Sequence, residues 1–425
     1  MSLILIGAAM IASATACTDA QGTAGDSAGF PAATASTAAP AATRPELTPE
    51  ERKFYLDMAK SAWSYLDANY KPATGFVNAT ADWQNTTIWD IGGQLLAFRA
   101  AKELGILTPA EFEKRTRKAL STLEKVPLYR GMAYNKVYST TTGKMGEGGS
   151  HGFAATDLGR FLVAAKVLAV QEPQLKEQIE RVVKRVDFSQ IVKNGYLHGT
   201  LTGSKGQPWT FQEGRIGYEQ YVARGFAEWG ADVGNALDVK KNGRPKKILG
   251  VEILEDTRWQ DRLLSEPFIL YGIELGLTGD YRDLAANVLK LQQARYDSTG
   301  KMTIVSEDAS SIAPHYFYYY CVYCSGKPFV IDVSTPGKVL DGPRWVSTKA
   351  AFGWHALMPS DYTRKATEFV AAAYDPKKGW ASGVMEDTGK STNSWDVNTA
   401  AVLLEIAHYQ LRGGKPLIET APVTK

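Results

Sequence analysis

One helical unit recurs six times between residues 50 and 412, and this repetition constrains the fold more than any other feature. Each copy begins with polar, acidic or aromatic residues and continues as an apolar run rich in Ala and Leu. The copies are WDIGGQLLAFRAAKELG from Trp89, TDLGRFLVAAKVLAV from Thr156, YEQYVARGFAEWG from Tyr218, SEPFILYGIELGLTGDY from Ser265, STKAAFGWHALMPSDY from Ser347 and SWDVNTAAVLLEIAHY from Ser394. Such a repeat indicates one repetitive architecture rather than several unrelated domains.

Charged amphipathic segments alternate with these apolar copies. FEKRTRKALSTLEKV and QLKEQIERVVKRV place apolar residues at i, i+3, i+4 and i+7 and charges on the other face. A helix that is apolar all round is buried, whereas a helix charged on one side belongs to an outer layer. We therefore predict an all-α (α/α)6 toroid of six inner and six outer helices, with long loops at one mouth. An open α-solenoid is the alternative, although solenoid repeats are usually shorter and more regular.

The N-terminal segment differs in composition from the rest of the chain. MSLILIGAAMIASATAC has about ten apolar residues, too few to span a bilayer, which needs roughly twenty. It is typical of an export signal, and Cys17 stands where a bacterial lipoprotein carries its lipid. Residues 18–48 have almost no large apolar side chains and predict a flexible linker, so the single barrel domain is expected over residues 49–425. We expect a periplasmic or outer-membrane lipoprotein, with simple secretion as the alternative.

Composition excludes several kinds of partner. A formal net charge of +3 over 425 residues gives no strong field, which argues against nucleic acid and against membrane contact other than through a lipid anchor. The five histidines are scattered without ligand spacing, so neither a metal nor another cofactor is expected. Cys321 and Cys324 form a CxxC pair, for which we expect a structural role as a disulfide or as buried thiols. The oligomeric state is left open.

In a toroid the starts of the inner helices and the loops before them converge on one end. The acidic, basic and aromatic residues expected there are Trp89, Asp90, Asp157, Glu213, Arg215, Tyr218, Glu219, Glu266, Glu307, Asp308, Lys349, Trp380, Glu386 and Trp395. Helix capping explains single acids such as Asp90, Asp157 and Asp396, but a cap needs no aromatic neighbour. Aromatic faces beside carboxylates suit a sugar, whose C–H faces stack on rings and whose hydroxyls bond to charged groups.

The segment EGRIGYEQY, residues 213–221, concentrates these groups most strongly. Glu213 precedes Gly214 and is expected in a loop, where aromatic neighbours raise the pKa of a carboxyl and suit it to act as a general acid. Arg215 and Glu219 have the i, i+4 spacing of an ion pair. We expect Arg215 to hold Glu219 as an ionised sugar ligand.

Several segments together resemble a bacterial family of unknown function that is similar to the glucoamylase-like (α/α)6 proteins, including the endo-β-1,2-glucanases. They are TTIWDIGG (86–93), NKVYSTTTGKM (135–145), ATDLGRFL (155–162), EGRIGYEQY (213–221), SEPFILYGIELG (265–276), VSEDAS (305–310), STKAAFGW (347–354) and GWASGVMEDTG (379–389). The resemblance covers nearly the whole chain after residue 50. It implies a glycoside hydrolase of the cell envelope that acts on an exported or periplasmic glucan, and it favours inversion.

Glycoside hydrolysis generally requires a carboxylic acid and a second carboxylate as base or nucleophile. We predict Glu213 as the acid and rank its partner as Asp157, then Glu307, then Glu386. Arg215 and Lys349 are expected to orient hydroxyls, while Trp89, Trp380 and Trp395 stack on sugar rings.

Two other functions remain open. One is a polysaccharide lyase that uses His315 or Tyr316 as its base. The other is a non-catalytic glycan-binding lipoprotein of a polysaccharide export system.

Overall fold

The computed structural model describes residues 46–146, 151–203, 206–258, 261–310, 317–333, 339–421 and 423. The predicted export signal, Cys17 and residues 18–45 of the predicted linker lie outside this part of the chain, as do His315 and Tyr316. Among the described residues, no helix combines the length and the apolar character needed to cross a membrane.

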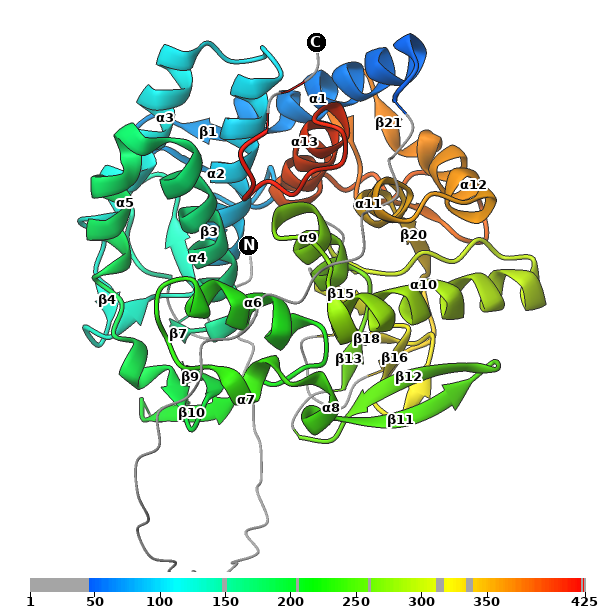
Figure 1. The fold of residues 1–425 in the computed structure, drawn as a ribbon. Coiled ribbons are helices and arrows are strands. Elements are labelled where there is room, and N and C mark those ends of the chain that lie inside the picture. Colours follow the sequence, from blue (N-terminus) through cyan, green and yellow to red (C-terminus); the bar gives the residue numbers. More distant parts are fainter. Residues whose placement is uncertain are drawn as a thin grey trace, which may run out of the picture.

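Six buried helices form the centre of the molecule, and each begins within three residues of its predicted start (Figure 1). They are α2 (Ile88–Glu103), α4 (Ala155–Gln171), α6 (Tyr218–Ala227), α9 (Glu266–Glu274), α11 (Thr348–Leu357) and α13 (Val397–Leu411). Each contacts the next in chain order, and α13 also contacts α2. The helix contacts therefore close into a ring.

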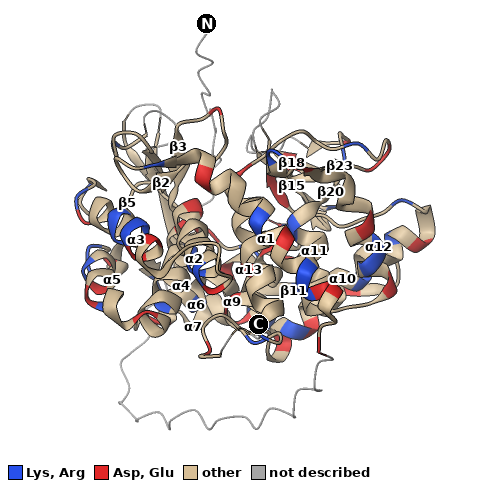
Figure 2. Cartoon of the chain, turned by 90° about the horizontal axis from the view of Figure 1, so that it is seen from above, with Lys and Arg blue, Asp and Glu red and all other residues tan. Residues whose placement is uncertain are grey.

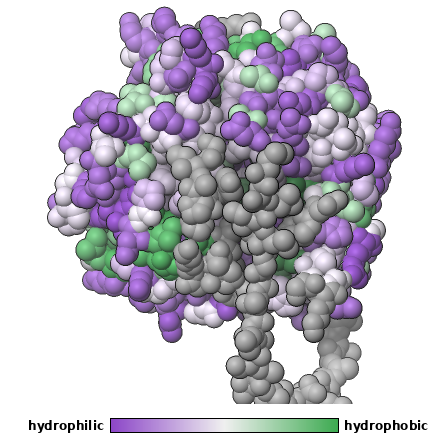
Figure 3. Space-filling model, turned by 180° about the vertical axis from the view of Figure 1, so that it is seen from behind, coloured by the Kyte–Doolittle hydropathy of each residue, from purple (hydrophilic) through white to green (hydrophobic). Residues whose placement is uncertain are grey.

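A second layer of helices with charged faces covers this ring. Its members are α1 (Pro49–Asn69), α3 (Pro109–Leu123), α5 (Lys176–Val183), α10 (Gly279–Thr299) and α12 (Asp361–Phe369). Figure 2 shows Lys, Arg, Asp and Glu on α3, α5, α10 and α12. On the face opposite to the view of Figure 1, the surface that grey residues do not cover is largely hydrophilic, with hydrophobic residues in separate patches (Figure 3).

The prediction of six outer helices is wrong between α6 and α9. There the chain forms two four-residue helices, α7 (Gly234–Leu237) and α8 (Val239–Asn242), followed by a hairpin of β11 (Gly243–Ile248) and β12 (Val251–Asp256). Gly243, Pro245 and Gly250 explain the change, because proline removes a helical hydrogen bond and glycine favours a turn.

The all-α prediction also missed the strands of the loops. All strands of the described residues except the β11–β12 pair lie in segments leading into an inner helix, and Figure 2 shows β3, β15, β18, β20 and β23 at one end of the helices. The strands before α2, α4 and α6 are β1 (Tyr70–Lys71), β2 (Phe76–Val77), β3 (Asn85–Thr87), β4 (Leu128–Tyr129), β5 (Ala133–Tyr134), β6 (Val137–Ser139), β7 (Gly152–Phe153), β8 (Val192–Lys193), β9 (Tyr196–Thr202) and β10 (Pro208–Gln212). Those before α9, α11 and α13 are β13 (Arg262–Leu263), β14 (Glu307–Ala309), β15 (Phe317–Tyr320), β16 (Tyr323–Cys324), β17 (Lys327–Pro328), β18 (Ile331–Val333), β19 (Val339–Leu340), β20 (Trp345–Ser347), β21 (Tyr374–Asp375), β22 (Gly379–Trp380) and β23 (Gly383–Met385).

Two small antiparallel sheets are the largest of these strand groups. One has the order β10–β9–β7, with β8 also paired to β9, and the other has the order β14–β15–β18–β19. Glu213 follows the first sheet directly, and β14 of the second contains Glu307 and Asp308. The sheets therefore position acids beside the starts of the inner helices.

Candidate active site

A circuit of contacts joins the N-terminal ends of the six inner helices and strand β14. Its members, in order, are Trp89, Tyr218, Glu307, Lys349, Glu266, Asn398 and Arg160. The rings of Trp89 and Tyr218 lie 5.8 Å apart between centroids, and the Tyr218 hydroxyl donates to Glu307. Lys349 Nζ donates to the Glu307 carbonyl at 2.5 Å.

The other half of the circuit is held by charged contacts. Lys349 pairs with Glu266 at 3.0 Å, and Asn398 donates to Glu266 at 2.6 Å. Arg160 donates to the Asn398 side-chain oxygen at 2.6 Å, and its guanidinium lies 4.8 Å from the Trp89 ring centroid. All six inner helices thus contribute one residue to a single end of the ring.

Asp157, Glu213 and Glu307 form a carboxyl cluster at this end. Glu213 accepts hydrogen bonds from the backbone N–H of Thr156 at 2.8 Å and from its hydroxyl at 3.3 Å. Asp157 follows in the first turn of α4, and its carboxyl makes no hydrogen bond or ion pair with the described residues. Asp157 and Glu307 are partly exposed, whereas Glu213 is buried.

Burial raises the pKa values of all three carboxyls, and repulsion from Glu266 adds to the shift of Glu307. Burial raises the pKa of Asp157 to about 7, and the charges of Glu213 and Glu307 add to the shift. Burial also raises the pKa values of Glu213 and Glu307, although hydrogen bonds from Thr156 and Tyr218 oppose the shift by favouring the charged forms. Asp157 accepts no such hydrogen bond, so it is the member of the cluster that most readily keeps its proton.

Three cations lie near the cluster, and Lys349 lowers the pKa of Glu307 in part. The charge of Lys136 lowers the pKa values of Asp157 and Glu213 in part, and Arg215 does the same for Glu213 and Glu307. The Arg215 guanidinium lies 4.6 Å from the Tyr218 ring centroid, and Arg215 is only 9% exposed. The guanidinium makes no hydrogen bond or ion pair with the described residues, so its N–H donors are available to a ligand.

Two of the predicted acids serve the architecture of this end. Asp90 forms a capping box with Thr87 at the start of α2, and burial raises its pKa to about 6. Asp308 accepts from Trp345 Nε1 at 2.9 Å and from the Ser347 hydroxyl at 3.0 Å, which secures β20, and burial raises its pKa to about 6. Asp396 caps α13 by accepting a hydrogen bond from the backbone N–H of Thr399, in agreement with helix capping as the explanation of this acid.

The structure contradicts the roles predicted for Glu219 and Glu386. Glu219 is fully buried and accepts from Arg258 and from Gln212, so it is not held by Arg215 and is not available as a sugar ligand. Both carboxylate oxygens of Glu386 accept from Arg295 of α10, at 2.8 and 3.0 Å. Because both oxygens of Glu386 are occupied by strong hydrogen bonds, this arrangement argues against a role as acid or base.

The three predicted tryptophans have different surroundings. Trp89 is partly exposed beside Tyr218 and Arg160. Trp380 is 8% exposed and packs against Phe352 and Tyr374, so the structure gives it no open face for a sugar. The Trp395 ring has the Lys378 ammonium 4.3 Å from its centroid.

Four further residues belong to the site although the sequence did not single them out. They are Lys136, Thr156, Arg160 and Asn398. Arg160 and Asn398 had a visible signal, since each interrupts an otherwise apolar inner helix. Cys321 and Cys324 are buried and do not form a disulfide. Of the two predicted arrangements, a disulfide or buried thiols, the structure has the buried thiols.

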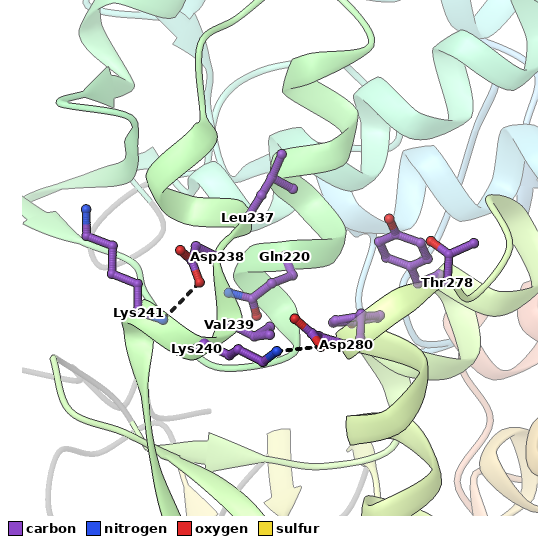
Figure 4. A pocket seen from close by; sticks show the side chains of 10 residues that line it. Gln220, Leu237, Asp238, Val239, Lys240, Lys241, Thr278 and Asp280 are labelled. Carbon is purple, nitrogen blue, oxygen red and sulfur yellow. Dashed lines mark hydrogen bonds and ion pairs between the residues drawn. The ribbon is translucent and has the colours of Figure 1, made fainter. Parts of the chain in front are cut away.

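A hollow of the described surface lies away from the carboxyl cluster. Its volume is about 810 Å³, and it is lined by residues of α6, α7, α8, α9 and the start of α10, where the sixth outer helix is missing (Figure 4). Lys240 pairs with Asp280 across it at 2.8 Å, and none of the cluster carboxyls lines it. Among the described residues, no group of His, Cys, Asp and Glu could hold a metal ion.

Solved structures with the same fold include glucan-degrading enzymes. The β-1,2-glucanase from Parabacteroides distasonis is 16% identical, with a TM-score of 0.63 over 87% of this chain and 58% of that chain. The endo-β-1,2-glucanase from Chitinophaga pinensis, solved with sophorotriose and glucose, is 14% identical, with a TM-score of 0.60 over 86% and 94%. A candidate glucoamylase from Bacteroides caccae is 14% identical, with a TM-score of 0.63 over 86% and 94%. At these identities the likeness establishes the fold alone.

Comparison with curated proteins gives no significant match. The model of one family covers most of the chain, from residue 57 to residue 413. This protein therefore belongs to the DUF3131 family, whose members are described as proteins of unknown function.

Proposed function

We propose that this protein is a glycoside hydrolase that cleaves a β-glucan, with β-1,2-glucan as the first substrate to test. The observation that carries the proposal is the cluster of Asp157, Glu213 and Glu307 beside Arg215 and two aromatic rings. The endo-β-1,2-glucanases that share the fold support this choice of substrate.

The surroundings of the carboxyls suggest a division of roles. With a pKa of about 7, Asp157 keeps a proton near neutrality and suits the general acid that protonates the leaving oxygen. Glu213 and Glu307 accept hydrogen bonds that favour their charged forms, so we assign the base to one of these two. This differs from the sequence-based assignment, which gave the acid role to Glu213.

The available guanidinium of Arg215 suits sugar hydroxyls. A guanidinium presents five N–H donors in a fixed plane, and its position over Tyr218 directs them beside the carboxyls.

The test is incubation of the full chain with β-1,2-glucan and other β-glucans, with new reducing ends as the readout. We expect Asp157→Asn and Glu213→Gln each to lower the rate by about 10² to 10⁴, the usual loss for a general acid or base. Asp57→Asn and Glu113→Gln on the outer helices are the matched controls and should leave the rate unchanged.

Absence of turnover on every glucan, with binding retained in both cluster variants, would support the non-catalytic glycan-binding alternative instead.

Resemblance to the endo-β-1,2-glucanases favours inversion. The anomeric form of the first product, observed by NMR, tests that part of the proposal.

A further inference from the structure

An aromatic pair extends from the carboxyl cluster along the β9–β10 hairpin. Trp209 and Phe211 lie two residues apart on β10, with ring centroids 4.7 Å apart and planes 29° from parallel. Trp209 is 41% exposed. One exposed ring needs no explanation, but two stacked rings next to an acid cluster form a flat apolar surface.

Strand geometry places this surface on the same side as Glu213. Side chains alternate along a strand, so Trp209, Phe211 and Glu213 share one face, and the bond from Glu213 N to the Leu197 carbonyl continues the ladder that far. Thr210 lies on the other face, where its hydroxyl is 2.9 Å from that of Thr200.

A glycine keeps this face flat between the acid and the aromatic pair. Gly199 is the cross-strand partner of Phe211, and a Cβ at Gly199 would lie 2.4 Å from the Glu213 carboxylate. The face therefore continues from the carboxylate over Gly199 to Phe211 and Trp209.

The spacing fits a chain rather than a single sugar. At about 3.3 Å per residue, the backbone positions of Glu213 and Trp209 lie about 13 Å apart. The Glu213 carboxylate itself lies over Gly199, opposite Phe211, so a chain of sugars that leaves the carboxyls along β10 passes Phe211 first and then Trp209.

We propose that Trp209 and Phe211 form a remote subsite that binds a sugar unit of a glucan chain whose scissile bond lies at the carboxyl cluster. This inference rests on the proposed function and adds a preference for long substrates. Stacking against the two rings supplies binding energy that only a polymer can use, and such energy raises kcat/KM for the polymer.

The experiment compares kcat/KM for long β-1,2-glucan with kcat/KM for the shortest sophoro-oligosaccharide that the protein cleaves. Trp209→Ala should lower the value for the polymer about tenfold and leave the short-substrate value unchanged. Trp209→Phe should retain most of the preference, because it keeps a stacking ring. Phe54→Ala, which removes an exposed ring from α1, is the matched control and should change neither value.

The outcomes separate this inference from the proposed function. Equal kcat/KM losses on both substrates in Trp209→Ala, or no loss on either, would overturn the remote subsite while leaving the hydrolase intact. If the unchanged protein cleaves no β-1,2-glucan, the proposed function fails for this substrate and the inference fails with it.

Discussion

At the scale of single residues, environment decides which acids are available for chemistry. Asp90 is engaged by Thr87, the cap residue of its own helix, whereas Asp308 and Glu386 are engaged by Trp345 and Arg295 of other elements. The carboxyl of Asp157 has no such partner among the described residues, and repulsion from Glu213 and Glu307 adds to the effect of burial on its pKa. For Asp308 and Glu386 the partners lie far away in the chain, where a sequence motif does not reveal them.

The raised pKa of Asp157 predicts the alkaline limb of the pH–rate profile. A general acid is active only while protonated, so kcat/KM should fall as the pH rises through about 7. Kinetics on β-1,2-glucan between pH 4 and pH 9 would measure this limb.

Removing the charge of Lys136 provides the control for the assignment of Asp157 as the general acid. The charge of Lys136 lowers the pKa of Asp157, so Lys136→Met should move the alkaline limb to higher pH. A limb that stays in place in Lys136→Met and lies well away from pH 7 in the unchanged protein would contradict the role of Asp157 as the acid.

At the scale of elements, close helix packing fixes the positions of the acids. Helices α4 and α6 approach closely at Gly159 and Gly225, where no larger side chain fits. A Cβ added at Gly159 would lie 2.3 Å from the Val222 Cβ, and a Cβ added at Gly225 would lie 2.3 Å from the Gly159 carbonyl oxygen. This contact sets the approach of Asp157 on α4 to Tyr218 on α6.

Gly159→Ala should therefore destabilise the fold, although alanine normally favours a helix. Overpacking costs about 1–3 kcal/mol, and the misplaced α4 should also lower hydrolysis. Urea unfolding would measure the loss of stability, and Gly234→Ala at the exposed start of α7, where an added Cβ meets nothing closer than 3.7 Å, is the control. Equal stability of the two variants would show that the α4–α6 spacing is not set by Gly159.

The inner helices were predictable because each is long, apolar and marked by a polar start. The strands were not predictable, since most have two or three residues and show no alternation of apolar and polar side chains.

Within the site, the sequence identified Asp157, Glu213 and Glu307 as neighbours. It misassigned Glu219 and Glu386, whose partners Arg258 and Arg295 lie 39 and 91 positions away.

At the scale of the whole molecule, ring closure makes the site. The α13–α2 contact brings residues from both ends of the domain together, so that Asn398 of α13 reaches Arg160 of α4 and Glu266 of α9. Arg160 is fully buried and also pairs with Glu405 at 3.4 Å, which fixes the relative positions of three inner helices. The site therefore depends on all six repeats and on no single motif.

The most direct test of the account is a crystal structure of Asp157→Asn with a bound β-1,2-gluco-oligosaccharide. We predict that a glycosidic oxygen lies within hydrogen-bonding distance of residue 157 and that Arg215 donates to a sugar hydroxyl. A sugar chain bound elsewhere, for instance in the hollow lined by Lys240 and Asp280, with the carboxyl cluster untouched, would contradict the account.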